Sequence, residues 1–69
     1  MHGLRILEFL KKNGKSEIET IAKNIRVPEI FVKKEIERLK EKEFVIVEGD
    51  KVKISEKGIE ELLKYVKRV

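Results

Sequence analysis

The stretch from Ile18 to Phe44 most constrains the fold, because it holds two amphipathic helical patterns with only a short turn between them. The first pattern places four apolar side chains at the spacing of one helix face: Ile18, Ile21, Ala22 and Ile25. The second runs from Pro28 to about Lys42 and stacks three apolar side chains on one face: Val32, Ile36 and Leu39. Arg26-Val27 forms the turn, and Pro28 suits the first position of a helix because its missing amide would be unsatisfied there anyway. Helices joined by so short a turn form a compact pair, and we expect the rest of the chain to support it.

Helical patterns also stand at both ends of the chain. Gly3 to Lys12 carries apolar residues on one face, and Asn13-Gly14 ends that pattern. Ser16, with Glu19 three residues later, predicts a capping box at the start of the second helix. Ser55 is the predicted cap of a last helix, from Glu56 to about Arg68. The apolar stripes of these two terminal helices are Leu4, Ile6, Leu7 and Leu10, and Ile59, Leu62, Leu63 and Val66.

Between the third and fourth helices the apolar period changes to that of strands. Phe44 to Val47 is largely β-branched, Gly49 supplies the turn, and Val52 to Ile54 alternates as a return strand. Because an isolated two-stranded hairpin is marginal, we expect it to pack on the helices or to pair with a further short strand. The predicted fold is α+β and mainly α, with three helices, a hairpin and a C-terminal helix in one domain, residues 1–69.

The net charge of the chain and its lack of catalytic and metal-binding residue types limit the functions that it can have. The chain has 17 Lys and Arg against 13 Asp and Glu, a net charge of +4, which favours a polyanionic partner. A solvated ion-pair surface is the competing explanation, since a chain rich in Lys and Glu and free of Gln is typical of heat-adapted organisms. There is no Cys, one His and one Asp, so no catalytic triad, Cys/His pair or metal cluster can be built. We expect no enzyme activity, no metal, no cofactor and no small-molecule ligand.

Localisation follows from what the chain does not contain. No segment approaches the roughly 20 apolar residues that cross a bilayer. Met1-His2-Gly3 leads directly into a helical pattern, without the features of a signal peptide. We therefore expect a cytoplasmic protein with no membrane partner.

Two runs resemble winged helix-turn-helix transcription regulators of the MarR and ArsR type. Such proteins often read A-x-x-L-G-V-S-x-x-T-V-x-x-x-L-x-x-L-E-x-x-G-L-V, and after the wing L-T-x-x-G-x-x-L-L. The apolar slots of the first pattern are filled by Ala22, Ile25, Val27, Val32, Ile36, Leu39, Phe44 and Val45. The run from Ile54 to Leu63 is similar to the second, with Gly58 at its glycine. The resemblance implies a compact, archaeal-type winged helix with a recognition helix, Pro28–Lys42, and a wing, residues 44–54.

Four positions depart from the first pattern. Arg26 stands at the turn glycine, where a left-handed conformation would cost about 1 kcal/mol. Pro28 stands at the capping serine, Phe31 at a residue that often contacts phosphate, and Glu43 at the glycine that ends the recognition helix.

The resemblance implies a transcriptional regulator that binds double-stranded DNA, with its recognition helix in the major groove and its wing on the backbone. The implied nucleic-acid-binding residues are Lys23, Arg26, Ile30, Phe31, Lys33, Lys34, Glu37, Arg38, Lys51 and Lys53. Lys15 joins Lys23 and Arg26 as a candidate phosphate clamp, and Ile30 and Phe31 suit thymine methyl groups. The alternative is a winged-helix protein–protein interaction module. Helix 28–42 carries five cations against four carboxylates, and two apolar residues on its outward face also suit a protein partner.

A homodimer is the second predicted partnership. A 69-residue chain without disulfides builds a small core, and apolar residues remain at its two ends: Phe9, Tyr65 and Val69. Because the first and last helices of winged-helix folds are adjacent, these residues are the predicted dimer interface. A symmetric dimer would place two recognition helices about one DNA turn apart, roughly 34–36 Å. Alternatively, Phe9 and Tyr65 simply widen the core of a monomer.

Overall fold

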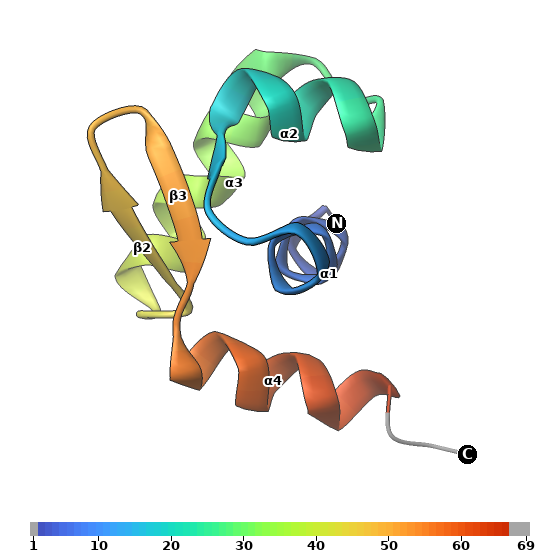
Figure 1. Ribbon diagram of the computed structural model, residues 1–69, viewed down its shortest axis with the longest axis vertical. Coiled ribbons are helices and arrows are strands. Elements are labelled where there is room, and N and C mark those ends of the chain that lie inside the picture. The colour runs from blue at the N-terminus through green and yellow to red at the C-terminus, as the bar shows by residue number, and fades with distance from the viewer. Residues whose placement is uncertain (1, 67–69) are drawn as a thin grey trace.

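The computed structural model describes residues 2–66, and this span holds these elements: α1 Gly3–Asn13, β1 Ser16–Glu17, α2 Ile18–Ile25, α3 Glu29–Glu41, β2 Val45–Glu48, β3 Lys51–Ile54 and α4 Glu56–Val66. Helix α1 lies at the centre of the fold, between α2 and α4 (Figure 1). The β2–β3 hairpin stands beside it, and α3 contacts both α2 and β2. The α+β, mainly helical class predicted from sequence is confirmed.

The strands form an antiparallel sheet with the order β1-β3-β2. The hairpin was expected to pack on the helices or to pair with a further short strand, and β1 is such a strand, with Ser16 paired to Val52. The capping box predicted at Ser16 is therefore wrong, because this residue belongs to the sheet and its hydroxyl donates to the carbonyl of Gly14 at 2.9 Å. Helix α2 begins instead at Ile18, after Glu17, which makes no side-chain cap.

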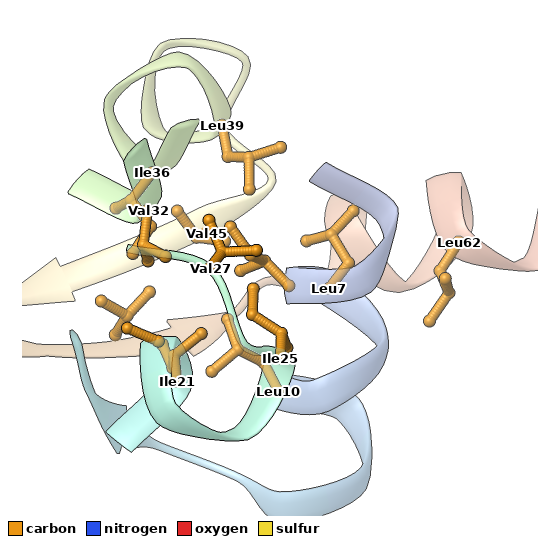
Figure 2. Close-up of a cluster of buried hydrophobic side chains, with 13 residues drawn as sticks. Leu7, Leu10, Ile21, Ile25, Val27, Val32, Ile36, Leu39, Val45 and Leu62 are labelled. Atoms are coloured by element: carbon orange, nitrogen blue, oxygen red, sulfur yellow. The ribbon is translucent and has the colours of Figure 1, made fainter. Parts of the chain in front are cut away.

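The core gathers apolar side chains from all four helices and from β2 and β3 (Figure 2). The predicted inward faces of the helix pair are confirmed, since the buried residues there are Ile21, Ala22, Ile25, Val32, Ile36 and Leu39. Two predicted core residues are wrong: Leu4 is 40% exposed and Leu63 is 47% exposed. Each directly follows a buried residue, and one step along a helix turns the side chain by about 100°, past the core.

Left-handed backbone brackets helix α3. Arg26 (φ 59°) ends α2, and Glu43 (φ 67°) follows the end of α3. Both positions hold a glycine in the winged-helix pattern, and here the conformation is kept although the side chain disfavours it. The hairpin tip has the same positive φ at Gly49, where the residue type fits.

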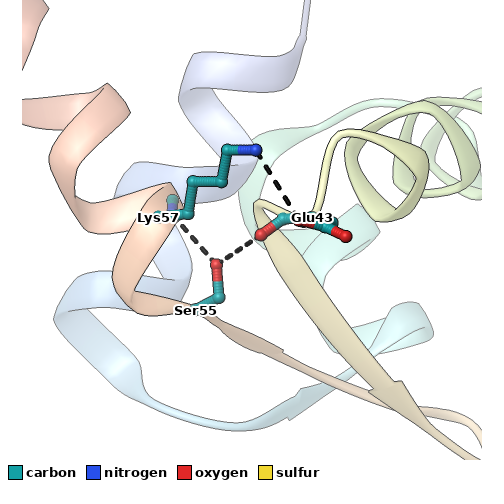
Figure 3. A network of polar contacts seen from close by, with 4 residues as sticks. Glu43, Ser55 and Lys57 are labelled. Carbon is teal, nitrogen blue, oxygen red and sulfur yellow. Dashed lines mark hydrogen bonds and ion pairs between the residues drawn. The ribbon is translucent and has the colours of Figure 1, made fainter.

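A polar network joins the end of α3 to the start of α4 (Figure 3). The hydroxyl of Ser55 donates to the carbonyl of Glu43 at 2.7 Å and accepts from the amide of Gly58 at 3.0 Å, which confirms Ser55 as a helix cap. The backbone packs so closely here that a methyl group added at Gly58 would overlap the Phe44 carbonyl oxygen. The glycine of the second sequence pattern is therefore required by close approach.

Among the described residues, no helix has the length and apolar character needed to cross a membrane.

Candidate nucleic-acid interface

The outer face of α3 combines apolar and cationic side chains. Val32 and Ile36 are buried, so the residues on the opposite side of the helix face solvent. Ile30 is 61% exposed and Phe31 is 51% exposed, although both are large and apolar. Lys34 and Arg38 follow Ile30 at intervals of one helical turn, and both are exposed. The structure thus brings five predicted binding residues onto one surface, which we call the α3 outer face: Ile30, Phe31, Lys34, Glu37 and Arg38.

Ion pairs divide the cations of α3 into two groups. Lys33 pairs with Glu29 at 3.9 Å, as its spacing predicts, and Arg38 lies 3.5 Å from the carboxylate of Glu35. The Lys33–Glu29 pair is exposed and contributes about 0–1 kcal/mol, so Lys33 can exchange its partner for another anion. In the second pair Arg38 is exposed, whereas the Glu35 side chain is only 16% exposed. Lys34 has no ion pair within the part of the chain that the structure describes.

The α2–α3 turn places two more predicted residues beside the start of α3. Lys23 and Arg26 line a shallow hollow of about 330 Å³ together with Glu29. Lys23 is exposed and only loosely paired, at 3.9 Å from Glu19. The left-handed Arg26 ends α2 on the same side. Pro28, which precedes the first turn of α3, contributes no side-chain cap to it.

The sheet offers much less free positive charge than its lysines suggest. Val52 is buried, so Lys51 and Lys53 belong to the opposite, outer face of β3. Paired residues of neighbouring strands share a face, and the register places Lys51 between Glu17 of β1 and Glu48 of β2. Lys53 is half-buried and lies opposite the apolar Ile46. The two lysines predicted to contact the DNA backbone therefore lie among carboxylates and apolar surface.

The hairpin tip is fixed to the start of α2. The Lys15 ammonium donates a hydrogen bond to the Glu48 carboxylate at 2.7 Å. Lys15, which was predicted to contact phosphate, is therefore already paired with a carboxylate. This hydrogen bond and the charges of Lys15 and Lys53 lower the pKa of Glu48 below its ordinary value. The amide of Ile18 also donates to the carbonyl of Asp50 at 3.3 Å. The hairpin and β1 carry two lysines, Lys51 and Lys53, and three carboxylates, Glu17, Glu48 and Asp50; Lys15 directly precedes β1.

A groove of about 790 Å³ separates the outer parts of α1 and α4 and reaches the end of α2. Phe9 lines it but is half-buried and packs on the core, as the monomer alternative predicts. Tyr65, by contrast, is 58% exposed, and Val69 lies outside the described residues. The groove also has residues that sequence reasoning did not select: Arg5, Lys11, Lys12 and Leu63. The helical period of the sequence could have predicted that these cations lie close together on α1. It could not have predicted that α4 lies opposite them.

Groups that hold metals do not form in the described span. No three His, Cys, Asp or Glu side chains of residues 2–66 gather closely enough to bind a metal ion. The candidate site is the α3 outer face together with the α2–α3 turn, because these two places bring together most of the predicted binding residues.

In comparisons with known proteins, no family model, curated protein or solved structure matches the chain.

Proposed function

We propose that this protein is a winged helix-turn-helix regulator that binds double-stranded DNA through the α3 outer face. The observation that carries the proposal is the line of Ile30, Lys34 and Arg38, exposed at successive turns of a helix that a short turn joins to α2. An α-helix fits the major groove, where lysine and arginine bind guanine and apolar groups contact thymine. The order of three helices, a hairpin and a helix is compatible with this fold.

In the proposed complex, the parts of the interface have different roles. Lys34 and Arg38 contact base edges or the phosphates beside them, because both are exposed on the α3 outer face. Lys23 and Arg26 contact phosphates at the entrance to the groove and so fix the orientation of α3. The hairpin acts as a short wing with a small electrostatic contribution, since Glu17 and Glu48 flank its exposed lysine.

The proposed regulator is a symmetric dimer formed by the α1–α4 groove. The charged residues that line the groove, Arg5, Glu8, Lys11 and Lys12, sum to +2, whereas α4 carries three glutamates and two lysines. A second copy can therefore place its acidic α4 against the basic side of α1 while exposed Leu63 is buried. Sedimentation should give a dimer that Leu63→Lys converts to a folded monomer. A monomeric parent chain at high micromolar concentration would rule out the dimer without affecting DNA binding by one copy.

The salt dependence of binding tests the proposed function. Fluorescence anisotropy with a labelled duplex should show micromolar or tighter binding at about 50 mM salt, weakening with a slope of about −0.9 per neutralised phosphate. A dimer that contacts roughly six to ten phosphates should lose affinity about 10³- to 10⁵-fold between 50 and 200 mM salt. Failure of micromolar protein to bind any duplex at the lower salt would contradict the proposal and favour a protein-interaction module.

A further inference from the structure

Glu35 is the carboxylate of α3 that the fold shields most from solvent. Its side chain is 16% exposed, whereas the other glutamates of the helix, Glu29, Glu37 and Glu41, are exposed residues. A charged group in such a place is costly unless an opposite charge stands beside it. Among residues 2–66, its ion pair is with Arg38, whose Nη1 lies 3.5 Å from Oε1 of Glu35. Arg38 therefore compensates a shielded charge, and leaving Glu35 would cost more than leaving an exposed partner.

The start of α1 lies against the same carboxylate. Gly3 is the first residue of α1, and a methyl group added to it would lie 2.9 Å from Oε2 of Glu35. Carbon and oxygen do not normally approach so closely, so the glycine leaves the space that this oxygen occupies. One oxygen of Glu35 thus faces α1 and the other faces Arg38, and the position of the carboxylate is restricted from both sides.

The ion pair uses only part of the Arg38 guanidinium. The Arg38 side chain remains 59% exposed, on the α3 outer face. A guanidinium is planar and carries five N–H donors in a fixed fork, so an interaction at one nitrogen orients the plane and leaves other donors free. Two such donors fit O6 and N7 of guanine, which both face the major groove.

Orientation matters here because the charges on the exposed side of α3 nearly cancel. Lys34 and Arg38 are offset by Glu37 and Glu41, which have no ion pair among the residues that the structure describes. Two cations and two carboxylates give little net attraction to the phosphates of any sequence. A preference for one sequence must therefore come from how individual donors are aimed.

We propose that Glu35 is a positioning residue, which orients Arg38 toward a guanine in the major groove and so sets the base preference of α3. Glu35 acts through Arg38 and does not itself contact DNA. The inference rests on the proposed function and adds a determinant of specificity to it. Its distinctive consequence is that removal of a negative charge from α3 should weaken the preference for the best sequence.

Base preference and general affinity are measured separately on the full chain. A preferred sequence is selected from a pool of randomised duplexes, and anisotropy then gives the ratio of affinities for that duplex and for a random-sequence duplex at one salt concentration. Glu35→Gln removes the charge and keeps the size of the side chain. We expect it to lower the ratio about five- to tenfold, as for the loss of one base contact. Binding to the random duplex should become slightly tighter, because a negative charge is lost.

Glu41→Gln is the matched control. Glu41 lies three residues after Arg38, as Glu35 lies three residues before it, but Glu41 is exposed and has no ion pair among residues 2–66. This substitution changes the net charge equally, so it should also tighten binding to the random duplex, yet it should leave the ratio intact. Equal decreases of the ratio in both variants would overturn the inference.

Gly3→Ala tests the same contact without any change in charge. The added methyl group should displace the Glu35 carboxylate and lower the ratio, while binding to the random duplex stays at the parent value. Alanine is more favourable than glycine in a helix, so this variant should fold. A ratio that stays at the parent value in Gly3→Ala would show that the shielded position of Glu35 does not orient Arg38.

A double-mutant cycle distinguishes the positioning of Arg38 from a general effect on the fold. In an Arg38→Ala background, Glu35→Gln should leave the ratio unchanged, because no guanidinium remains to be oriented. A further decrease in that background would assign the effect to the fold and overturn the inference.

Two more results would overturn the inference while leaving DNA binding in place. The first is an unchanged ratio in Glu35→Gln, or a selection that yields no preferred sequence. The second is an equal loss of affinity for both duplexes in Glu35→Gln, which would assign Arg38 to a phosphate instead of a base. Absence of binding to every duplex would instead refute the proposed function, and the inference with it.

Discussion

The α3 outer face and the outer face of the sheet both carry lysines that the sequence assigns to DNA, yet their surroundings differ. On α3, Lys34 stands without an ion pair among the described residues. On the sheet, Lys51 lies between Glu17 and Glu48 on neighbouring strands. Helical neighbours can be read from spacing along the chain, whereas strand neighbours come from distant segments. The comparison shows that the number of lysines on a face overstates how much of its positive charge is available to phosphate.

The largest expected difference between the two faces is in DNA affinity. Lys34→Ala should weaken binding by about 1–3 kcal/mol, because it removes from α3 a cation that has no ion pair among residues 2–66 and that we propose to contact DNA. Lys51→Ala should cost roughly 0.5 kcal/mol or less, since nearby carboxylates already offset its charge. Lys57→Ala, in the first turn of α4 and away from Leu63, changes the net charge equally and serves as the control. Anisotropy titrations that gave equal losses for Lys34 and Lys51 would remove the distinction between the faces.

Substitutions at the two positions with left-handed backbone, one after α3 and one at the hairpin tip, should have a smaller effect, which is on the stability of the fold. Glu43 after α3 and Gly49 at the hairpin tip both have positive φ, but only the glycine adopts it freely. Glu43→Gly should stabilise the fold by about 0.5–1 kcal/mol, even though it removes an exposed ion pair with Lys57. Gly49→Ala should destabilise it by about 1 kcal/mol. Urea unfolding measures both changes, and a loss of stability in Glu43→Gly would show that this side chain contributes more than the strain costs.

The smallest expected effect is the pH dependence of the hairpin. Lys15 and Lys53 lower the folded-state pKa of Glu48, so the Lys15–Glu48 interaction is fully present above the carboxyl's ordinary pKa, 4.5. Its contribution to stability should disappear as the pH falls through the lowered folded-state value. The Glu48 side-chain resonance should titrate below 4.5, and Lys15→Ala should move its midpoint upward. A midpoint that Lys15→Ala leaves unchanged would mean that the pair does not form in solution.

Local patterns in the sequence predicted the helices and most of the core. Val32, Ile36 and Leu39 share a face because of their spacing alone, and all three are buried. The same spacing placed Leu63 in the core wrongly, since α4 turns it away by one residue step.

Contacts between distant segments were beyond the sequence patterns. The pairing of β1 with β3 converts Ser16 from a predicted helix cap into a strand residue. The same pairing brings Glu17 beside Lys51 across the chain. On the candidate site, exposure of Ile30 and Phe31 followed from helical position, whereas the partners of Lys15 and Lys51 required the register of the sheet.

Mapping the DNA contact surface by NMR tests the central claim most directly. Backbone amide resonances of the chain are followed as a short duplex is added at low salt, with the Lys34→Ala variant in parallel. We predict the largest shifts in the α2–α3 turn and along residues 30–38, small shifts in the hairpin and none specific to α4. Shifts centred on the α1–α4 groove, or no shifts at saturating duplex, would contradict the assignment of the α3 outer face to DNA.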